Sequence, residues 1–235
     1  MKTLAIAAVA AFAATGAAFA ADPPMAPPVV VAPAMFDWSG FYIGAHVGGG
    51  WGVVTQEFDV DPPGPAFVAA PDISVSGWLA GVQAGANMQT GRFVLGIEGR
   101  VDWVAISGND AALPVTATFD TNWSASALAR AGIAVGAEGR GLVYLIGGVT
   151  GLNYDYTLTA GANVATANAT ALGGSVGVGV EFAVTDRVSI FGEYLHTFYG
   201  TNTIQTAAAL PGIASQRSNV RPSIGTATVG VNFHF

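Results

Sequence analysis

The sequence predicts an all-β protein: a single eight-stranded, antiparallel, up-and-down transmembrane β-barrel that follows a cleaved signal peptide. Three observations support this fold class. Of the 235 residues, 51% are hydrophobic and only 10% are charged, whereas roughly a quarter are charged in soluble domains. Beyond Asp37 the apolar residues recur with period two, as they do in strands. No apolar run beyond this point reaches the ~20 residues that a membrane-spanning helix requires.

The N-terminus has the pattern of a secretory signal peptide. Lys2 precedes an apolar stretch over residues 4–14, and Ala18-Phe19-Ala20 forms a small-x-small cleavage site. We expect residues 1–20 to be removed, because the apolar stretch is too short for the alternative, an N-terminal membrane anchor. Residues 21–36 are rich in proline and lack any period, which predicts an extended Pro-rich leader. The predicted barrel domain comprises residues 37–235.

Eight segments alternate between bulky apolar side chains and small or polar ones, and each is predicted to be one strand. They are residues 41–51, 78–88, 93–103, 123–135, 142–156, 172–184, 188–198 and 225–235. In residues 93–103 every charged side chain falls on one face. In residues 142–156 the alternation does not separate the two faces.

The composition of the two faces predicts which side meets lipid. One face carries Trp, Phe, Leu, Val and Ala with almost no charge, and the other carries Gly, Ser, Asn, Thr and a few charges. A soluble barrel would place its apolar face inside and many charges outside. We therefore expect the apolar face to contact hydrocarbon and the sheet to close, because an open edge would leave amide groups unpaired in lipid.

Loop lengths and aromatic residues predict the orientation. Short connections at Thr90-Gly91, residues 136–141 and Thr185-Asp186 are expected to face the periplasm. Longer ones at residues 52–72, 106–117, 157–169 and 200–218 are expected to face outward. Aromatic residues near the strand ends are expected at the membrane interfaces; they are Trp38, Trp78, Trp103, Trp123, Tyr194, Phe198, Phe233 and Phe235.

Four sequence blocks carry a resemblance to a known family. They are residues 38–44 (WSGFYIG), 180–189 (VEFAVTDRVS), 193–195 (EYL) and 229–235 (VGVNFHF). Together they resemble the outer-membrane immunogenic protein family of alphaproteobacteria, which are small porin-like barrels related to the OmpA transmembrane domain. This resemblance implies a location in the outer membrane of a Gram-negative bacterium. It also implies that Phe233 and Phe235 form the terminal signal recognised by the outer-membrane assembly machinery.

Six charged residues project into the predicted lumen: Glu98, Arg100, Asp102, Arg130, Glu181 and Glu193. Because unpaired buried charges are very costly, Arg100 and Arg130 are expected to bridge the acidic groups in a polar network. Eight strands leave an interior that side chains largely fill, so the network is interpreted as a structural plug in preference to a conduction path.

Catalytic and metal sites have little support in the sequence. The missing cysteine excludes disulfides, zinc–thiolate sites and a cysteine nucleophile. His46 and His234 are expected to face inward, at opposite places along the barrel axis, and His196 to face lipid or the outer interface. No metal or other cofactor is therefore expected. The acidic balance of 15 Asp+Glu against 8 Lys+Arg makes nucleic acid a poor partner.

The predicted function is that of a non-enzymatic outer-membrane barrel with a structural, surface-antigen role and, secondarily, restricted passage of small solutes. The alternative is a surface receptor for haem or another small ligand, using His196, Tyr194 and the outer-loop residues Tyr154 and Tyr156. A barrel-embedded hydrolase ranks last. The expected partners are outer-membrane lipids and the assembly machinery; the sequence indicates no particular oligomeric state.

Overall fold

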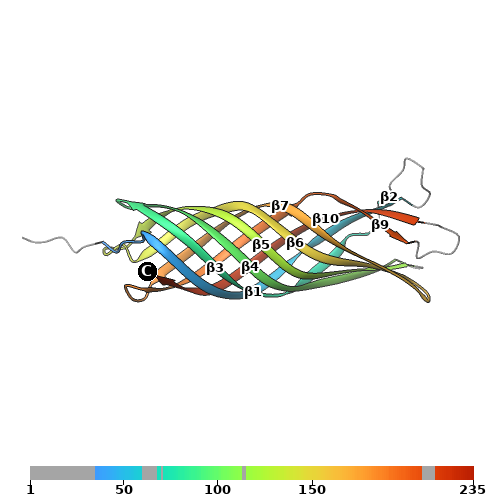
Figure 1. Ribbon diagram of the computed structural model, residues 1–235, viewed down its shortest axis with the longest axis horizontal. Helices are drawn as coiled ribbons and strands as arrows, with labels where there is room; N and C mark the ends of the chain where they lie inside the picture. Colours follow the sequence, from blue (N-terminus) through green and yellow to red (C-terminus); the bar gives the residue numbers. More distant parts are fainter. Residues whose placement is uncertain (1–34, 60–67, 70, 113–114, 208–214) are drawn as a thin grey trace, which may run out of the picture. The chain divides into compact units, whose positions relative to one another are not determined.

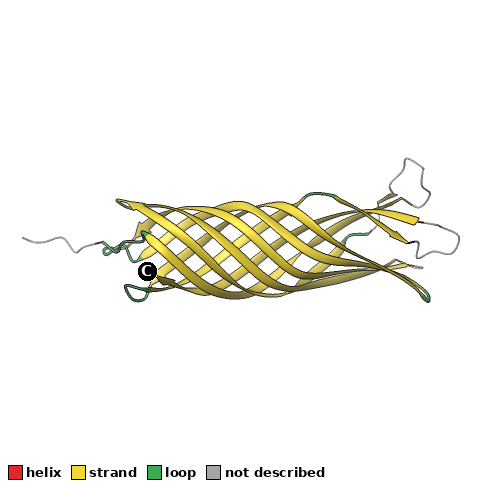
Figure 2. Ribbon diagram, in the orientation of Figure 1, coloured by secondary structure: helices red, strands yellow, loops and turns green. Residues whose placement is uncertain are grey.

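The structure, a computed structural model, describes residues 35–59, 68–69, 71–112, 115–207 and 215–235. The predicted signal peptide, residues 1–20, and the leader up to residue 34 lie outside the described residues. Within the described part of the chain, every regular element is a β-strand (Figure 2). No helix in this part is long and apolar enough to cross a membrane.

Eight long antiparallel strands close into a ring (Figure 1). They are β1 (Gly40–Asp59), β3 (Ile73–Thr90), β4 (Phe93–Ala112), β5 (Val115–Val135), β6 (Gly141–Ala160), β7 (Asn163–Ala183), β8 (Val188–Tyr199) and β10 (Ser215–His234). Pairing of β1 with β10 closes the ring. Two short strands, β2 (Val68–Ala69) and β9 (Asn202–Ala207), pair with β1 and β10. The predicted barrel is confirmed, and each predicted segment lies within one long strand except for the end residues Val184 and Phe235.

The outer surface of the ring is apolar. Val47, Leu145 and Val178 are all more than half exposed. Exposed aromatic side chains gather in two bands. One band contains Trp51, Trp78, Trp103, Trp123 and Phe198, and the other contains Phe41, Phe93, Phe182, Phe233 and Phe235. Along β1, the rise from Phe41 to Trp51 corresponds to ~25 Å of barrel height at ~3.3 Å per residue and ~40° tilt, which matches the apolar band of outer-membrane barrels.

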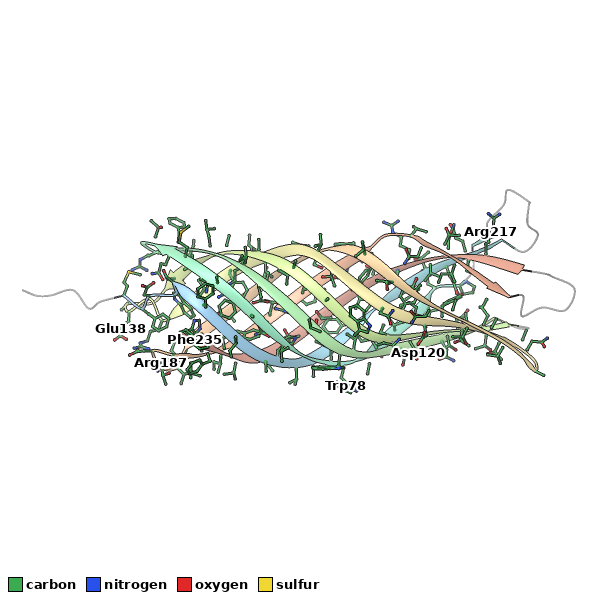
Figure 3. The ribbon with its side chains drawn as sticks, viewed as in Figure 1. Trp78, Asp120, Glu138, Arg187, Arg217 and Phe235 are labelled. Carbon is green, nitrogen blue, oxygen red and sulfur yellow. The ribbon has the colours of Figure 1, made fainter. Side chains whose placement is uncertain are left out.

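Short turns lie together at the end of the barrel that holds Phe235, where Figure 3 also shows Glu138 and Arg187. Gly91 and Arg92 join β3 to β4, residues 136–140 join β5 to β6, and residues 184–187 join β7 to β8. Gly91 and Gly136 have φ angles of 60° and 88°, a region where an L side chain is strained and glycine is not. Following the orientation predicted from loop length, this end is called periplasmic and the other extracellular.

The long outer loops are the part of the predicted fold that is wrong. Residues 106–117 and 157–169 consist mostly of strand, because β4, β5, β6 and β7 all continue beyond the apolar band. β6 and β7 meet in a tight hairpin at Gly161-Ala162, where Gly161 has φ 59°. β1 likewise runs to Asp59 and β10 begins at Ser215, within the expected loops 52–72 and 200–218.

Above the apolar band the ring divides into two sheets. Pairing of β3 with β4 ends at Ser76–Ser107, and pairing of β7 with β8 ends at Gly173–Tyr199. Beyond these pairs, β4, β5, β6 and β7 remain paired with one another, and β2, β1, β10 and β9 form a second paired set in which the end of β3 (Ile73–Val75) still pairs with β1. Apolar side chains fill the interior here; among them are Val54, Ile106, Phe119, Tyr154, Tyr156, Leu158, Ile204 and Val220.

Candidate functional site in the barrel lumen

Trp38 closes the periplasmic mouth of the barrel from within. Its side chain is fully buried, and Nε1 donates a hydrogen bond of 2.9 Å to the carbonyl oxygen of Gly139. The backbone N–H of Trp38 donates to Oε1 of Gln89 at 2.7 Å. The ring of Phe36 lies 4.8 Å from the Trp38 ring, and the Arg140 guanidinium lies over Phe36. The prediction of an interfacial Trp38 is therefore wrong, because residues 36–38 turn into the mouth.

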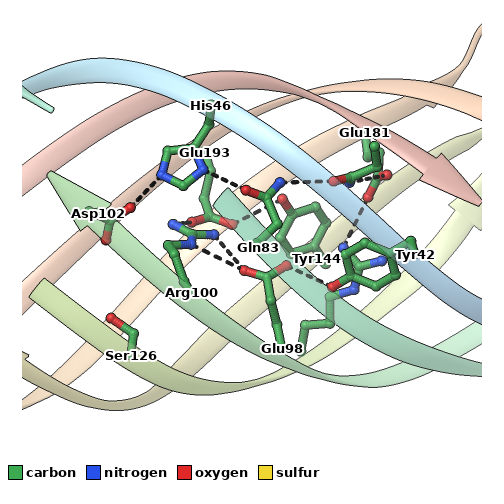
Figure 4. Close-up of polar contacts among 12 residues, drawn as sticks. Tyr42, His46, Gln83, Glu98, Arg100, Asp102, Ser126, Tyr144, Glu181 and Glu193 are labelled. Carbon is green, nitrogen blue, oxygen red and sulfur yellow. Dashed lines mark hydrogen bonds and ion pairs between the residues drawn. The ribbon is translucent and has the colours of Figure 1, made fainter. Parts of the chain in front are cut away.

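A charged layer centred on Arg100 lies deeper in the lumen (Figure 4). Nη2 of Arg100 pairs with Oε1 of Glu98 at 2.7 Å, and Nη1 pairs with Oε1 of Glu193 at 2.9 Å. The hydroxyl of Tyr42 donates to Glu98 at 2.7 Å, and that of Tyr144 donates to Glu193 at 3.0 Å. One arginine therefore holds carboxylates from β4 and β8, and two tyrosines complete their hydrogen bonds.

Arg130 forms a second buried pair. Its Nη1 atom lies 3.0 Å from Oε2 of Glu181, and Nε donates to Oδ1 of Asn87 at 2.8 Å. The guanidinium carbon lies 4.5 Å from the ring centre of Tyr42 and 5.3 Å from that of Tyr144. The cation is thus stabilised by one carboxylate and two aromatic faces.

Glu181 is also bound by side chains from β8 and β10. Asn232 donates to Oε1 of Glu181 at 2.8 Å, and Ser189 donates to the same oxygen. Nε2 of His234 lies 2.9 Å from the Ser189 hydroxyl and 3.5 Å from Glu181. Gln83 donates to Asn232 at 2.8 Å, so these contacts continue toward β3.

His46 and Asp102 extend the network toward the extracellular side. Nε2 of His46 lies 2.6 Å from Oδ1 of Asp102, and Nδ1 contacts Oε1 of Gln83. Ser124 donates to the other carboxylate oxygen of Asp102 at 3.0 Å. The lumen therefore holds four carboxylates whose partners are two arginines, two histidines and neutral donors.

Two glycines make room for the tyrosines. A Cβ atom on Gly179 would lie 2.3 Å from the Tyr144 ring, and a Cβ atom on Gly85 would lie 2.3 Å from the Tyr42 hydroxyl. No real Cβ atom approaches another atom so closely. The charged layer therefore depends on glycine at both positions.

A belt of hydroxyl groups lies above the charges. Ser175 is hydrogen-bonded to Thr150 and to Thr197, and Thr150 to Ser126. The cavity at this level is about 40 Å³ in volume, which admits no more than a few water molecules. From periplasm to exterior, the lumen thus contains four layers. They are an aromatic stopper formed by Phe36 and Trp38, the charged network, the hydroxyl belt and the apolar interior of the extracellular sheets.

All six charged residues predicted for the lumen are buried there. Arg100 and Arg130 bridge Glu98, Glu193 and Glu181, whereas Asp102 contacts His46. The neutral partners in this network were not among the predicted lumen residues; they are Tyr42, Tyr144, Gln83, Asn232 and Ser189. The sequence signal that could have identified them is their position on the inward face of the alternating pattern.

The histidines only partly follow the prediction. His46 and His234 face inward and His196 faces outward, as expected. His46 and His234 do not lie at opposite places along the axis, because Tyr42 pairs with His234 and His46 with Gly230 on the same two strands. Among the residues that the structure describes, no group of three or more His, Asp or Glu side chains could hold a metal ion.

The four residues considered for haem binding do not converge. Tyr154 and Tyr156 lie in β6, not in a loop, and both are fully buried in the extracellular half of the lumen. Tyr194 and His196 lie on the outer surface of β8, where the Tyr194 hydroxyl is 3.2 Å from Nδ1 of His196. The expectation of accessible Tyr154 and Tyr156 is therefore wrong.

Ser189, His234 and Glu181 are the described residues nearest to a hydrolytic triad, but their geometry is unsuitable. Glu181 contacts Nε2 of His234 and the Ser189 hydroxyl itself, whereas a triad carboxylate orients the other ring nitrogen. Ser189 is also completely buried. This geometry gives the hydroxyl no access to a substrate.

Comparisons with known proteins agree with this architecture. The profile of a family described as "Outer membrane protein beta-barrel domain" matches residues 4–235. The chain is 26% identical over 230 residues to the 25 kDa outer-membrane immunogenic protein of Brucella abortus, covering 96% of this chain and 97% of the relative. It is 28% identical over 249 residues to the 31 kDa outer-membrane immunogenic protein of Brucella melitensis, with both chains covered in full.

The solved structure of the outer membrane protein OprG from Pseudomonas aeruginosa is similar in fold. It superposes with a TM-score of 0.53 at 12% identity, covering 87% of this chain and all of OprG. The predicted location in the outer membrane is confirmed by these relatives and by the family match.

Proposed function

Because the chain belongs to the outer membrane protein beta-barrel domain family, we propose that it is a non-enzymatic structural barrel of the outer membrane that displays its strand extensions as a surface antigen. One observation carries this proposal: buried side chains close the lumen near Trp38, at Arg100 and near Phe119, and the cavity at the hydroxyl belt measures only about 40 Å³. A closed lumen supports rigid display of the extracellular sheets. The immunogenic relatives are consistent with exposure at the cell surface.

Conductance of the refolded chain in a planar bilayer tests the closed lumen. We expect no steady conductance from the wild type, because the stopper and the Arg100 layer both block the path. Trp38→Ala removes only the stopper and is expected to remain silent, since Arg100 still bridges Glu98 and Glu193. Stepwise openings of constant size in the wild type would instead favour the restricted passage of small solutes.

We further propose that Phe235 and Phe233 form the signal read by the outer-membrane assembly machinery. Both rings point outward, 40% exposed for Phe233 and 73% for Phe235, and pack edge to face at 5.3 Å. The backbone N–H of Phe235 donates to the carbonyl oxygen of Phe41 at 3.0 Å, next to the seam that closes the barrel. An exposed aromatic end beside the seam between β1 and β10 supports its recognition by another protein.

A further inference from the structure

The outward-facing side chains of β10 change character at one level. From Phe233 to Ala227 they are apolar and exposed, and toward the extracellular end they become Ser223, Arg221 and Asn219. Ser223 pairs with Val53 of β1 and with Phe198 of β8, which are 41% and 55% exposed at the edge of the apolar surface. Arg221 is therefore the first charged side chain of β10 beyond the apolar band.

Arg221 has no partner in the described part of the chain. It is exposed, forms no hydrogen bond or ion pair there, and lies opposite the neutral Thr55 of β1. Arg100, Arg130 and Arg140, by contrast, all pair with carboxylates. A cation at this level is free to take a ligand from outside the protein.

Polar groups continue from Arg221 down into the aromatic band. The hydroxyl of Ser223 lies 3.0 Å from Nε2 of His196, whose Nδ1 lies 3.2 Å from the Tyr194 hydroxyl. Two aromatic rings flank this row of polar groups. The ring centre of Trp51 lies 6.1 Å from that of Tyr194, and the ring centre of Phe198 lies 4.4 Å from that of His196. Hydrogen-bonding groups on a lipid-facing surface, held between aromatic rings, are typical of the interface between headgroups and hydrocarbon.

Among the described residues of β3 to β7, no outward side chain at this level is a cation. The outward side chains beyond the aromatic band on β3 to β7 are Ser76, Ser107, Asp120, Asn122, Asn153, Asp155, Asn168 and Thr170. The amides of Asn122 and Asn168 hold the pKa of Asp155 below its usual range, so this carboxylate remains ionised. β5, which carries Asp120, lies opposite β10 in the strand order of the ring. Asp120 and Asp155 therefore lie on the side of the rim away from Arg221. On the side of Arg221 the nearest outward carboxylate is Glu57 of β1, one pair further out, which accepts a hydrogen bond of 3.3 Å from the amide of Asn219.

We propose that Arg221, with Ser223 beneath it, binds a phosphate group in the headgroup of an outer-leaflet lipid. Guanidinium groups bind phosphate through two parallel charge-assisted hydrogen bonds. Arg221 lies ~5 Å above Ser223 along the barrel axis, at ~3.3 Å per residue and ~40° tilt, and its long stem reaches both headgroup and interface. The ligand is a lipid in preference to a free anion because the site adjoins the apolar band, where acyl chains cover Val53 and Phe198.

Retention of defined lipids by the detergent-solubilised barrel tests this proposal. Wild type and variants are titrated with bisphosphorylated lipid A or its dephosphorylated form, and bound lipid is counted by native mass spectrometry. We expect the wild type to prefer the phosphorylated lipid and Arg221→Gln to bind it roughly tenfold more weakly, the loss of one charge-assisted contact. Arg221→Lys should retain part of the affinity, because charge remains without the planar fork.

Matched controls separate this site from general charge effects. Arg92→Gln removes an exposed arginine at the periplasmic end, and Asp120→Asn changes charge on the opposite side of the rim; both should bind lipid like the wild type. Slower migration on gels after boiling than before verifies that each variant is folded. Equal affinity of Arg221→Gln and wild type, or no preference for the phosphorylated lipid, overturns the proposal. Displacement of the lipid by an equal concentration of inorganic phosphate overturns it too, since the site would then be for a free anion.

Discussion

Arg100 is the residue on which the charged layer depends most directly. It is the sole cation within ion-pair distance of both Glu98 and Glu193 among the described residues. Arg100→Gln leaves two buried carboxylates without that cation, and removing one partner of a buried pair costs ~3–5 kcal/mol. We expect the purified barrel to unfold at a lower urea concentration. The loss of the fast-migrating band on unboiled gels measures this midpoint.

Arg140→Gln is the matched control for this change. Arg140 pairs with Glu138 and Asp186, whose side chains are 61% and 84% exposed. Exposed ion pairs contribute little to stability, and the remaining contact of Arg140 is with the Phe36 ring, so its midpoint should fall far less than that of Arg100→Gln. An unchanged midpoint for Arg100→Gln would contradict the role assigned to the charged layer.

Gly179 tests the packing of the same layer. Gly179→Ala places a methyl group against the Tyr144 ring and should destabilise the barrel by ~1–3 kcal/mol, a typical cost of overpacking. Unfolding in urea measures the effect. Gly174→Ala is the control, because a Cβ atom there meets nothing within 4 Å. Similar effects of the two substitutions would indicate a general cost of losing glycine in a strand.

At the scale of single residues, the sequence predicted the charged lumen residues but not their neutral partners. Alternation along a strand decides which way Glu98 or Arg130 points. Which tyrosine reaches which carboxylate depends on the register across the barrel, as in the contact between Tyr42 of β1 and Glu98 of β4. No local pattern contains that information.

At the scale of elements, the hairpin of β6 and β7 provides a test of orientation. The chain contains no cysteine, so a single introduced thiol reports its own location. Ala162→Cys lies at the exposed tip of the hairpin and should react with a membrane-impermeant maleimide on intact cells. Ala137→Cys, in an exposed turn at the other end, should react only after the outer membrane is opened. The reverse pattern would mean that the barrel is inverted.

The extracellular strand extensions were missed because their residues give weak local signals. Residues 163–171 consist mainly of Ala, Thr and Asn, which resemble a polar loop in composition. They form a strand because β6 pairs with them over their whole length and their inward alanines pack on the apolar interior. The two faces of β6 were inseparable by sequence for a related reason, since Leu142 and Tyr144 point inward while Val143 and Leu145 point outward.

At the scale of the whole molecule, assembly in the cell tests the role of the C-terminal aromatic residues. Phe235→Ala should reduce the folded barrel in the outer membrane several-fold, measured as the unboiled fast-migrating band in isolated membranes. Refolding into detergent should be unaffected, because the Phe235 side chain is 73% exposed. Phe182→Ala, in the same aromatic band and 53% exposed, is the control. An equal loss of folded barrel for both variants would mean that the effect comes from the aromatic band as a whole and not from the C-terminal residue.

The sequence alone determined the fold class, the number of long strands, the lipid-facing surface and the charged residues of the lumen. These features follow from the alternation of residues along each strand, because one face contacts lipid and the other faces the lumen. Each strand shows this alternation in its own sequence. Three features emerged from the folded structure: Trp38 enters the mouth, the strands extend beyond the membrane, and particular residues pair across the lumen. Those features depend on contacts between strands far apart in the chain, whose relative positions are fixed only when β1 meets β10 and the ring closes.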